Sequence, residues 1–465
     1  MSAPLLWILL PIGMGALLLL VTRERAVSVL GGFSTGALSL LALLIPIDTA
    51  LLIGSASFKL QGTFSVLGRS FTLLPAHGPL LAILFGLAAL WFFGAESLGL
   101  SRRLIPLSMM ILGLLVASIA VQPFIFAALL IEIASLLAVP MLLPPDRKPG
   151  RGLVRFIIYQ TLAMPFILFA GWLLTSIETS PGDAKLTSAA IAMLGIGFAL
   201  LLALFPLNVW IPMLFDEASP YLVGFLMWLL PLVTALFAMD FLDRYTFLRG
   251  STELLLALRL SGILMVFTSG LWSVFERHLG RLMGYAVIAE TGFLLIGLGL
   301  GNDAGVQSIF MQIIPRGIAF AAWAYALTII SAQADSLRYY DIQGALRVVP
   351  LASIAVIAAG LSVAGLPLLG DFPARLTVLQ TLAAQSPAML AWVMLGVLGM
   401  LVGVIRTVSA MAAAPAEAAW ESHEEIAQRI WLGAGILSLF ALGVLPQIMN
   451  PLLKNLPALF SRLGG

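Results

Sequence analysis

The sequence predicts an all-α integral membrane protein with about fourteen transmembrane helices, and three observations support this prediction. Hydrophobic residues make up 61% of the 465 residues and charged residues only 10%, with a mean hydropathy of +1.08. The apolar residues form long runs separated by short polar loops, and two of these runs are interrupted by proline and glycine. A soluble domain of this size could not bury so much apolar surface, so the chain is expected to be polytopic.

A helix that crosses the hydrocarbon core needs about 17 to 25 mostly apolar residues. Fourteen runs meet this requirement, near 4–21, 27–54, 77–96, 104–121, 123–143, 153–177, 186–205, 219–240, 257–275, 281–301, 306–331, 350–370, 387–409 and 429–447. The second run contains Pro46 and Asp48, so its helix should be shorter than the run. The first run follows Met1 without a basic segment, which predicts a retained span rather than a cleaved signal peptide.

Two segments stand out from the series of apolar runs. Residues 57–75 partly alternate between polar and apolar side chains, which predicts a short hairpin outside the membrane. Residues 412–429 form an acidic loop, either a solvated connector or a contact for a partner. No linker is long enough to separate two domains, so residues 1–465 are expected to form a single membrane domain.

The two interruptions lie near residues 205–220 and 365–375. Paired interruptions are typical of transporter repeats, because an unwound helix exposes backbone dipoles only where it lines a cavity. We therefore predict two inverted five-helix repeats with flanking helices on both sides. The repeats cover 104–240 and 257–409, and the flanking helices cover 1–96 and 429–465.

Charge and cysteine content limit the location and the chemistry of the chain. Lys and Arg are about twice as frequent in the odd-numbered loops as in the even-numbered ones, which places the odd loops in the cytoplasm. With an even number of spans, both termini then lie on the non-cytoplasmic side of a bacterial-type inner membrane or its organelle equivalent. The net charge of +2 does not indicate nucleic-acid binding. Cysteine is absent, so we expect no cofactor in this chain.

Four segments resemble, in order, segments of one known protein family. They are FIFAALLIEIASLL (124–137), PLNVWIP followed by DEASP (206–220), ERHLGRLMGYAVIAETGFLLIGLGLGN (276–302), and YDIQGALRVVP with GLPLLGDFPARL (340–376). The second is similar to the pattern Pro-Leu-His-x-Trp-Leu-Pro followed by Glu-Ala-Pro. The family is that of the antiporter-like proton-translocating membrane subunits of respiratory complex I, group 4 membrane-bound hydrogenases and Mrp-type cation/proton antiporters. The resemblance implies a fourteen-helix fold and a role in proton movement.

The resemblance also implies a row of ionisable residues across the middle of the membrane. Glu132 corresponds to the buried glutamate of the family's fifth helix, and Glu217 to the Glu of its Glu-Ala-Pro. Glu290 stands at a position that is His in the family. The interruption near 365–375 keeps a cation, but as Arg375 rather than Lys.

Several of the family's proton-carrying positions have changed. The family's His-x-x-x-His-x-x-x-Lys ladder corresponds here to Gln312, Arg316 and Phe320. The lysine of its seventh helix corresponds to Leu232 or Val233, neither of which can carry a proton. The resemblance therefore implies a divergent member, in which any proton pathway relies on carboxylates.

The two buried arginines cannot relay protons, because a guanidinium does not deprotonate in proteins. They can bias neighbouring carboxylates or hold them ionised. We expect Arg316 to pair with Glu290 or Glu132, because an unpaired charge at mid-membrane is costly. Such a pair serves either proton movement or helix packing, and Glu290 is either a relay carboxylate or a counter-ion. Glu132 is either a functional residue of the family site or one retained for packing.

The acids of the first interruption allow two interpretations. Asp216 and Glu217, at the predicted cytoplasmic interface, form either a proton entry funnel or a pair of acids that favour the N-terminal dipole of a helix. Trp210 is expected at the membrane interface. The three histidines lie at predicted loop edges and are expected to be solvated.

Three functions remain open from the sequence. The first is a membrane-arm subunit of a redox-driven proton pump of the quinone-reducing or hydrogenase type, with other membrane-arm subunits and iron–sulfur subunits as partners. The chain would then be a non-redox subunit of a translocase, with protons and the lipid bilayer as its other partners. The second is a structural paralogue in such a complex that conducts no ions. The third is an Mrp-type Na⁺/H⁺ antiporter subunit.

Overall fold

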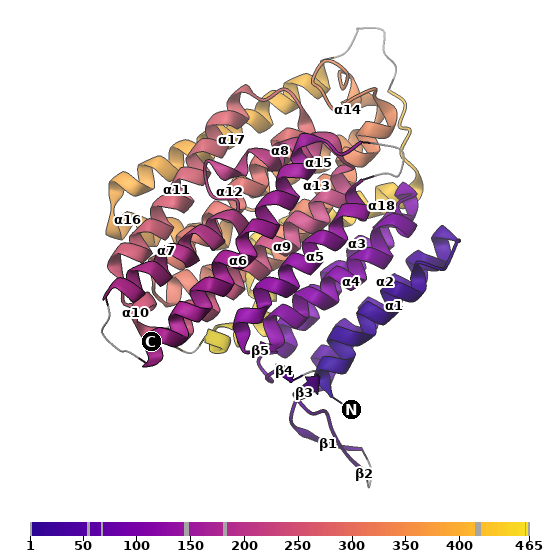
Figure 1. Cartoon of the computed structure of the whole chain (residues 1–465). Coiled ribbons are helices and arrows are strands. Elements are labelled where there is room, and N and C mark those ends of the chain that lie inside the picture. The colour runs from indigo at the N-terminus through magenta and orange to yellow at the C-terminus, as the bar shows by residue number, and fades with distance from the viewer. Residues whose placement is uncertain are drawn as a thin grey trace.

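The computed structural model describes residues 2–53, 56–66, 68–143, 148–179, 184–413, 420–460 and 462–463. In these residues, twelve helices are long and apolar enough to cross a membrane, and most run roughly side by side (Figure 1). They are α2 (Glu24–Leu44), α3 (His77–Ala95), α4 (Ser101–Ala120), α5 (Ala127–Leu142), α6 (Arg151–Thr179), α7 (Ala184–Leu201), α9 (Pro220–Arg244), α11 (Thr252–Phe275), α12 (Leu279–Leu300), α13 (Asp303–Gln333), α17 (Pro387–Ala412) and α18 (Ile426–Val444).

Two shorter apolar helical segments occupy the remaining predicted runs. They are η1 (Leu5–Leu9) continued by α1 (Leu10–Leu18), and α15 (Pro350–Val363). Each of the fourteen predicted runs therefore overlaps a helix, and the all-α membrane fold is confirmed. The second helix is indeed shorter than its run, because α2 ends at Leu44 and Ile45 is extended (φ −110°, ψ 100°) before Pro46.

Short elements join the long helices. They are η2 (Glu96–Leu98), η3 (Phe124–Phe126), η4 (Leu207–Val209), α8 (Trp210–Glu217), α10 (Thr246–Arg249), α14 (Ala345–Val348), α16 (Phe372–Gln385), η5 (Pro446–Met449), α19 (Asn450–Leu453) and η6 (Leu456–Phe460). Both predicted interruptions are present. The first separates α7 from α8 and α9, and the second separates α15 from α16.

Two hairpins extend from the end of the bundle where both chain termini lie (Figure 1). Strands β1 (Ala50–Ile53) and β2 (Ala56–Lys59) pair antiparallel. Strands β3 (Thr63–Val66) and β4 (Arg69–Thr72) form the hairpin predicted within residues 57–75, and β4 also pairs with β5 (Val121–Gln122). The hairpins thus tie the loop after α2 to the turn between α4 and α5. The side of the membrane on which they lie stays a prediction.

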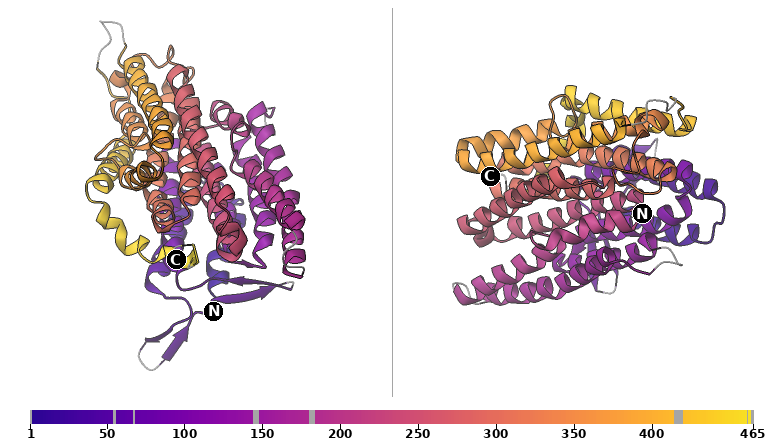
Figure 2. Two further views of the ribbon diagram at one scale, coloured as in Figure 1. Left: turned by 90° about the vertical axis from the view of Figure 1, so that its left-hand side faces the viewer. Right: turned by 90° about the horizontal axis from the view of Figure 1, so that it is seen from above.

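Helices α9 and α12 form the centre of the bundle. In each of them, 94% of the apolar membrane-spanning stretch is buried inside the protein. Helices α17 and α18 lie on one side of the bundle and α6 and α7 on the opposite side (Figure 2). The predicted loop 412–429 lies partly outside the described residues, and its last part precedes α18, where Glu425 accepts a capping-box hydrogen bond. The boundaries of the two repeats stay a prediction.

Glycines allow α11 and α17 to touch backbone to backbone. A Cβ atom on Gly270 would lie 1.9 Å from the carbonyl oxygen of Gly396, and one on Gly399 would lie 2.5 Å from that of Gly270. Small residues at such contacts are how membrane helices approach closely. The sequence shows these glycines but not which helices they join.

We expect Gly270→Val to loosen this contact and lower the stability of the protein by about 1–3 kcal/mol, as overpacking does. Gly36→Val is a matched control, because a Cβ atom there meets no atom within 4 Å. The measurement is the thermal unfolding midpoint of the purified protein in one detergent. Equal midpoints for the two variants would show that the α11–α17 contact can expand without loss.

Candidate functional site

A buried ion pair joins α12 to the helix that follows the second interruption. Glu290 lies in the middle of α12 with 1% of its side chain exposed, and Arg375 lies in the first turn of α16 with 3% exposed. Nη2 of Arg375 donates to Oε1 of Glu290 at 2.5 Å. The structure thus brings together two residues that the sequence predicted as site residues.

The broken helix is what brings Arg375 to this position. Gly365 adopts a left-handed conformation (φ +78°), and a Cβ atom there would lie 2.5 Å from Cδ of Arg375. The backbone of the break therefore packs directly against the arginine stem. On the other side, Cζ of Arg375 lies 3.8 Å from the ring centroid of Phe293, one helical turn beyond Glu290. This cation–π contact stabilises the buried guanidinium.

Asp371 is a second carboxylate of the site, and sequence reasoning missed it. Its side chain is fully buried, and Oδ2 accepts a hydrogen bond of 2.7 Å from the hydroxyl of Ser362 on α15. Its other oxygen, Oδ1, has no hydrogen-bond partner among the described residues. The signal was available in the sequence, because an acid lies inside the Pro/Gly-rich break four residues before Arg375.

Among the described residues, Arg316 on α13 pairs with no carboxylate, so the prediction of an ion pair with Glu290 or Glu132 is wrong. Its Nη2 donates instead to the carbonyl oxygen of Met227 on α9, at 3.0 Å. That carbonyl is available because Pro231, four residues on, has no N–H to bond it. Glu290 is already held by Arg375. The sequence could not reveal this choice, because it depends on which face of α9 meets α13.

The four charges nevertheless act on one another. Arg316 interacts electrostatically with Glu290, Asp371 and Arg375, so two arginines and two carboxylates share one buried region. Gln312 lies one turn before Arg316 and donates to the carbonyl of Ser308 at 3.1 Å. Six polar atoms here are buried without a partner in the described part of the chain: Nε and Nη1 of Arg316, Nε and Nη1 of Arg375, Oδ1 of Asp371 and Oε1 of Gln312. These are donors and acceptors that water molecules can bridge.

The first half of the chain presents a different environment. Glu132 on α5 is 8% exposed, and the described residues give it no hydrogen-bond or ion-pair partner. Nearby on the same helix, Ser135 donates to Oε1 of Gln160 at 3.4 Å, and Gln160 donates to the carbonyl of Leu201 at 3.2 Å. Within the described residues of α4 to α9, no lysine or arginine is buried. The carboxylate of the first half thus lacks the cation that its counterpart in the second half has.

The acids of the first interruption end α8 rather than begin a helix. Both oxygens of Glu217 accept hydrogen bonds from the backbone N–H groups of Gly152 and Leu153, at 2.8 to 3.1 Å, at the start of α6. Glu217 therefore stabilises the N-terminus of α6 rather than the N-terminus of the helix that follows it in the chain. Asp216 lines an open hollow of about 570 Å³ together with Arg281 and other charged side chains. The role of Asp216 as a proton entry residue stays a prediction.

Asp216 also holds two basic side chains. Its Oδ1 lies 3.1 Å from Nε2 of His278, and its Oδ2 accepts from Arg281 at 2.6 and 3.0 Å. The hydrogen bond to His278, helped by Arg281, keeps the pKa of the Asp216 carboxyl well below its usual range.

Two expectations around this interruption are wrong. His278 is only 8% exposed rather than solvated, and its Nε2 lies next to the carboxylate of Asp216. Trp210 is 2% exposed, with its ring centroid 5.2 Å from that of Phe156, so it packs inside the protein rather than at the membrane surface.

Comparison with known proteins identifies the fold and the family. The family model described as NADH:quinone oxidoreductase/Mrp antiporter, TM, matches residues 156–403, which is more than half of the chain. The chain belongs to this family. It is therefore a multi-pass membrane protein related to the antiporter-like subunits that the sequence motifs resemble.

Individual relatives agree with the family assignment. NADH-quinone oxidoreductase subunit N 2 of Solidesulfovibrio magneticus is 24% identical over 343 residues, which is 70% of each chain. A chain of respiratory complex I from Thermus thermophilus aligns over 99% of this chain and 100% of its own length, with a TM-score of 0.75 and 20% identity. A chain of the archaeal membrane-bound sulfane sulfur reductase covers 100% and 98%, with a TM-score of 0.82 and 17% identity. Both structures are of multi-subunit membrane complexes.

Against the pattern that the family motifs imply, this antiporter-like subunit has apolar residues where lysines are expected. Leu232 and Val233 on α9 are buried at 1% and 0% exposure, and Phe320 on α13 at 0%. Phe320 lies beneath Arg316, whose Cζ is 5.4 Å from the ring centroid. The roles of Glu132, Glu290, Arg316, Arg375 and the acids of α8 in proton movement stay predictions.

Removal of the Arg316 charge should destabilise the subunit in a way that depends on Pro231. In Arg316→Met the carbonyl of Met227 loses its donor, at a cost of about 1–3 kcal/mol. In the background of Pro231→Ala, an N–H can satisfy that carbonyl, so Arg316→Met should cost less there. A double-mutant cycle of thermal unfolding in detergent measures the coupling. Additive effects would mean that the hydrogen bond contributes nothing to stability.

The low pKa of Asp216 gives a pH dependence with a definite sign. Because folding lowers this pKa, the stabilisation from Asp216 is fully present above the ordinary value of about 3.9 and is lost as the pH falls through the lowered value. Asp216→Asn should therefore reduce stability at pH 7, and the difference from the unmodified protein should narrow below about pH 4. Unfolding midpoints across that pH range measure it. The exposed Asp335→Asn serves as control, and a difference that widened in acid would contradict the assignment.

Proposed function

We propose that this protein is an antiporter-like membrane-arm subunit of a redox-driven, complex I-related proton pump, and that it moves protons through its second half. The observation that supports the proposal is the buried group formed by Glu290, Asp371, Arg316 and Arg375 at the broken helix. Four ionisable side chains enclosed within apolar helices are costly to fold around and mark an ion pathway by default. A relative of this chain is named as a subunit of an NADH-quinone oxidoreductase, which also supports a redox-driven pump.

The two arginines set how the protons can move. Neither guanidinium releases a proton, so the carriers in this group are the carboxylates of Glu290 and Asp371. In the structure Arg375 donates a hydrogen bond to Glu290, an arrangement that favours a carboxylate acceptor. A proton that arrives on Glu290 neutralises it and weakens that pair, which frees Arg375 to turn its Nη1 toward Oδ1 of Asp371. When Arg375 returns to Glu290, the proton of Glu290 passes through bridging water to Asp371. Asp371 then releases it on the far side, so one proton is passed on for each exchange.

This scheme replaces lysine chemistry by carboxylate chemistry. A lysine relay changes its own charge, whereas Arg316 and Arg375 keep theirs and only move or bias a neighbour. The unpartnered buried atoms of Gln312, Arg316 and Asp371 supply the donors and acceptors for water molecules between the carriers. On the side predicted to face the cytoplasm, the hollow lined by Asp216 is the entrance that the scheme requires.

The proposal extends to partners and location. The chain has no cysteine, so electrons would pass through separate iron–sulfur subunits that bind elsewhere in the complex. The subunit would lie in a bacterial-type inner membrane with both termini on the non-cytoplasmic side, as the distribution of Lys and Arg predicts. Copurification of iron–sulfur subunits with the tagged chain tests this part, and copurification of small antiporter subunits alone would indicate the Mrp type.

A second candidate is a subunit that supports the complex without conducting ions. The apolar residues at the lysine positions, Leu232, Val233 and Phe320, favour this candidate. So does Glu132, for which the described residues provide no ion-pair partner. The two candidates differ in one measurable quantity, the number of protons translocated per electron pair.

We expect Glu290→Gln to lower the protons translocated per electron pair, because it removes a carrier and leaves Arg375 without its counter-charge. Glu132→Gln alone should have little effect, and the double variant should match Glu290→Gln. Asp371→Asn should reproduce the loss. The measurement is proton uptake by the reconstituted complex against electron transfer, with Glu253→Gln, exposed at the start of α11, as the matched control.

The same experiment can refute the proposal. Unchanged stoichiometry in the Glu132→Gln, Glu290→Gln double variant, with the complex fully assembled, would leave only the supporting role. A loss confined to Glu132→Gln would place the pathway in the first half and contradict the assignment to the second.

A further inference from the structure

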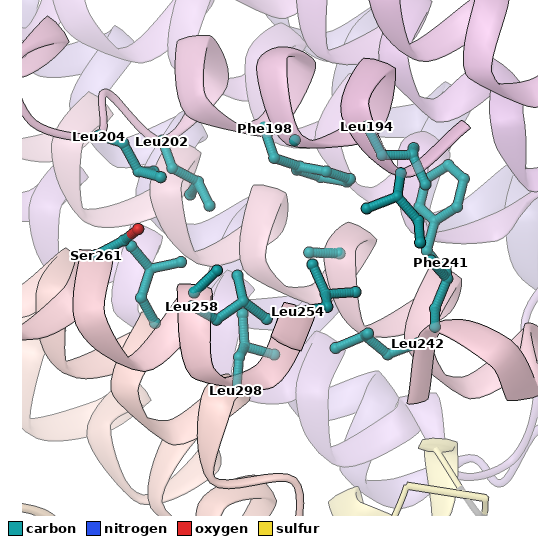
Figure 3. Close-up of a pocket in the computed structure, with 16 residues that line it drawn as sticks. Leu194, Phe198, Leu202, Leu204, Phe241, Leu242, Leu254, Leu258, Ser261 and Leu298 are labelled. Carbon is teal, nitrogen blue, oxygen red and sulfur yellow. The ribbon is translucent and has the colours of Figure 1, made fainter. Parts of the chain in front are cut away.

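An apolar cavity lies between the two halves of the subunit, away from the buried charges. It has a volume of about 230 Å³ and is lined by side chains of α7, α9, α10, α11 and α12 and of the link after α7. Figure 3 shows Leu194, Phe198 and Phe241 facing Leu254, Leu258 and Leu298 across the space. Ser261 is the one hydroxyl-bearing side chain among the sixteen lining residues.

Water is a poor occupant of such a cavity. A bound water molecule needs two to four polar partners, and apolar cavities of comparable size stay dry. An empty space would leave its lining side chains without van der Waals contacts on one side. In a bilayer the apolar groups at hand are the hydrocarbon chains of lipids, so the chemistry of the lining fits an acyl chain.

The position of the cavity gives a chain a way in. Helices α7 and α11 border the cavity. They are among the less buried spans, because only 28% and 39% of their apolar membrane-spanning stretches are buried inside the protein. Next to the cavity, Ile196 of α7 and Leu256 and Leu260 of α11 are 42%, 38% and 48% exposed, as is typical of side chains that face lipid. The floor is formed by the central helices α9 and α12.

A basic residue, Arg249, lies in a small hollow next to one end of the cavity. Leu242 and Leu298 line both this cavity and a smaller hollow that also includes Arg249, at the end of α10. Arg249 is half-buried and donates Nη1 to the carbonyl of Asp243 at 2.9 Å. A guanidinium has five donors in a planar fork that suits phosphate oxygens. A lipid with its chain in the cavity would therefore place an anionic headgroup where a cation is present.

We propose that this cavity binds one acyl chain of a phospholipid, with the headgroup phosphate at Arg249. The bound chain fills the space between α7 of the first half and α11 of the second. It thereby completes the packing between the halves without a protein side chain. This site is independent of the proton pathway proposed above, since no residue of the charged group lines it.

The test uses the full-length chain in nanodiscs and a phosphatidylglycerol that carries a photoactivatable diazirine in one acyl chain. After irradiation, peptide mapping should find adducts on α7 and α11. Gly195→Leu should reduce these adducts several-fold, because Gly195 lines the cavity and a Cβ atom there meets no atom within 4 Å. Gly433→Leu on α18 is the matched control: it also meets no atom within 4 Å, but it lies outside the cavity and should leave labelling unchanged.

A second arm tests the headgroup. Arg249→Gln should weaken labelling by the phospholipid several-fold, but not labelling by a diacylglycerol with the same diazirine chain and no phosphate. Equal labelling in Gly195→Leu and Gly433→Leu would overturn the proposal. So would stronger competition by an isoprenoid quinone than by unlabelled phosphatidylglycerol. Unfolding midpoints of each variant confirm that the fold is intact, and a labelling loss in a folded Gly195→Leu supports the site.

Discussion

The ion pair of Glu290 and Arg375 is the constraint around which the second half of this protein is arranged. Two opposite charges inside a membrane protein are tolerable only when they lie close together. The break between α15 and α16 serves this requirement, because it brings a basic side chain from a chain interruption into the middle of the bundle. Gly365 and Phe293 then fix the arginine from two sides. A continuous helix could not combine these contacts.

The two halves of the subunit differ in what surrounds their carboxylates. In the second half, Glu290 has a cation, a second acid nearby and unpartnered polar atoms around it. In the first half, Glu132 is buried without an ion-pair partner among the described residues, and the positions where the family pattern implies lysine are occupied by Leu232 and Val233. The proposal that the second half carries the protons rests on this difference in chemistry between the two halves.

Much of the fold could be predicted from the sequence because bilayer thickness sets the length of each apolar run. All fourteen runs correspond to helices, and both interruptions appear where proline and glycine cluster. The site was harder to predict. Glu290 and Arg375 were recognised individually, but their pairing depends on the path of the chain between α15 and α16. Arg316 was assigned the wrong partner, because the free carbonyl of Met227 arises from a proline on a different helix. Asp371 is not part of the family pattern, which includes only the cation four residues after it.

The short length of α16 has a mechanical consequence. This helix carries Arg375 in its first turn and meets α17 at Ser386, and α17 contacts α11 backbone to backbone at glycines. A movement of α11 or α17 caused by a neighbouring subunit would therefore also move α16. The other end of α16 carries the guanidinium 2.5 Å from Glu290, so a displacement of α16 would change the distance between these two charges. The position of α17 and the geometry of the Glu290–Arg375 ion pair are in this way linked through one short helix.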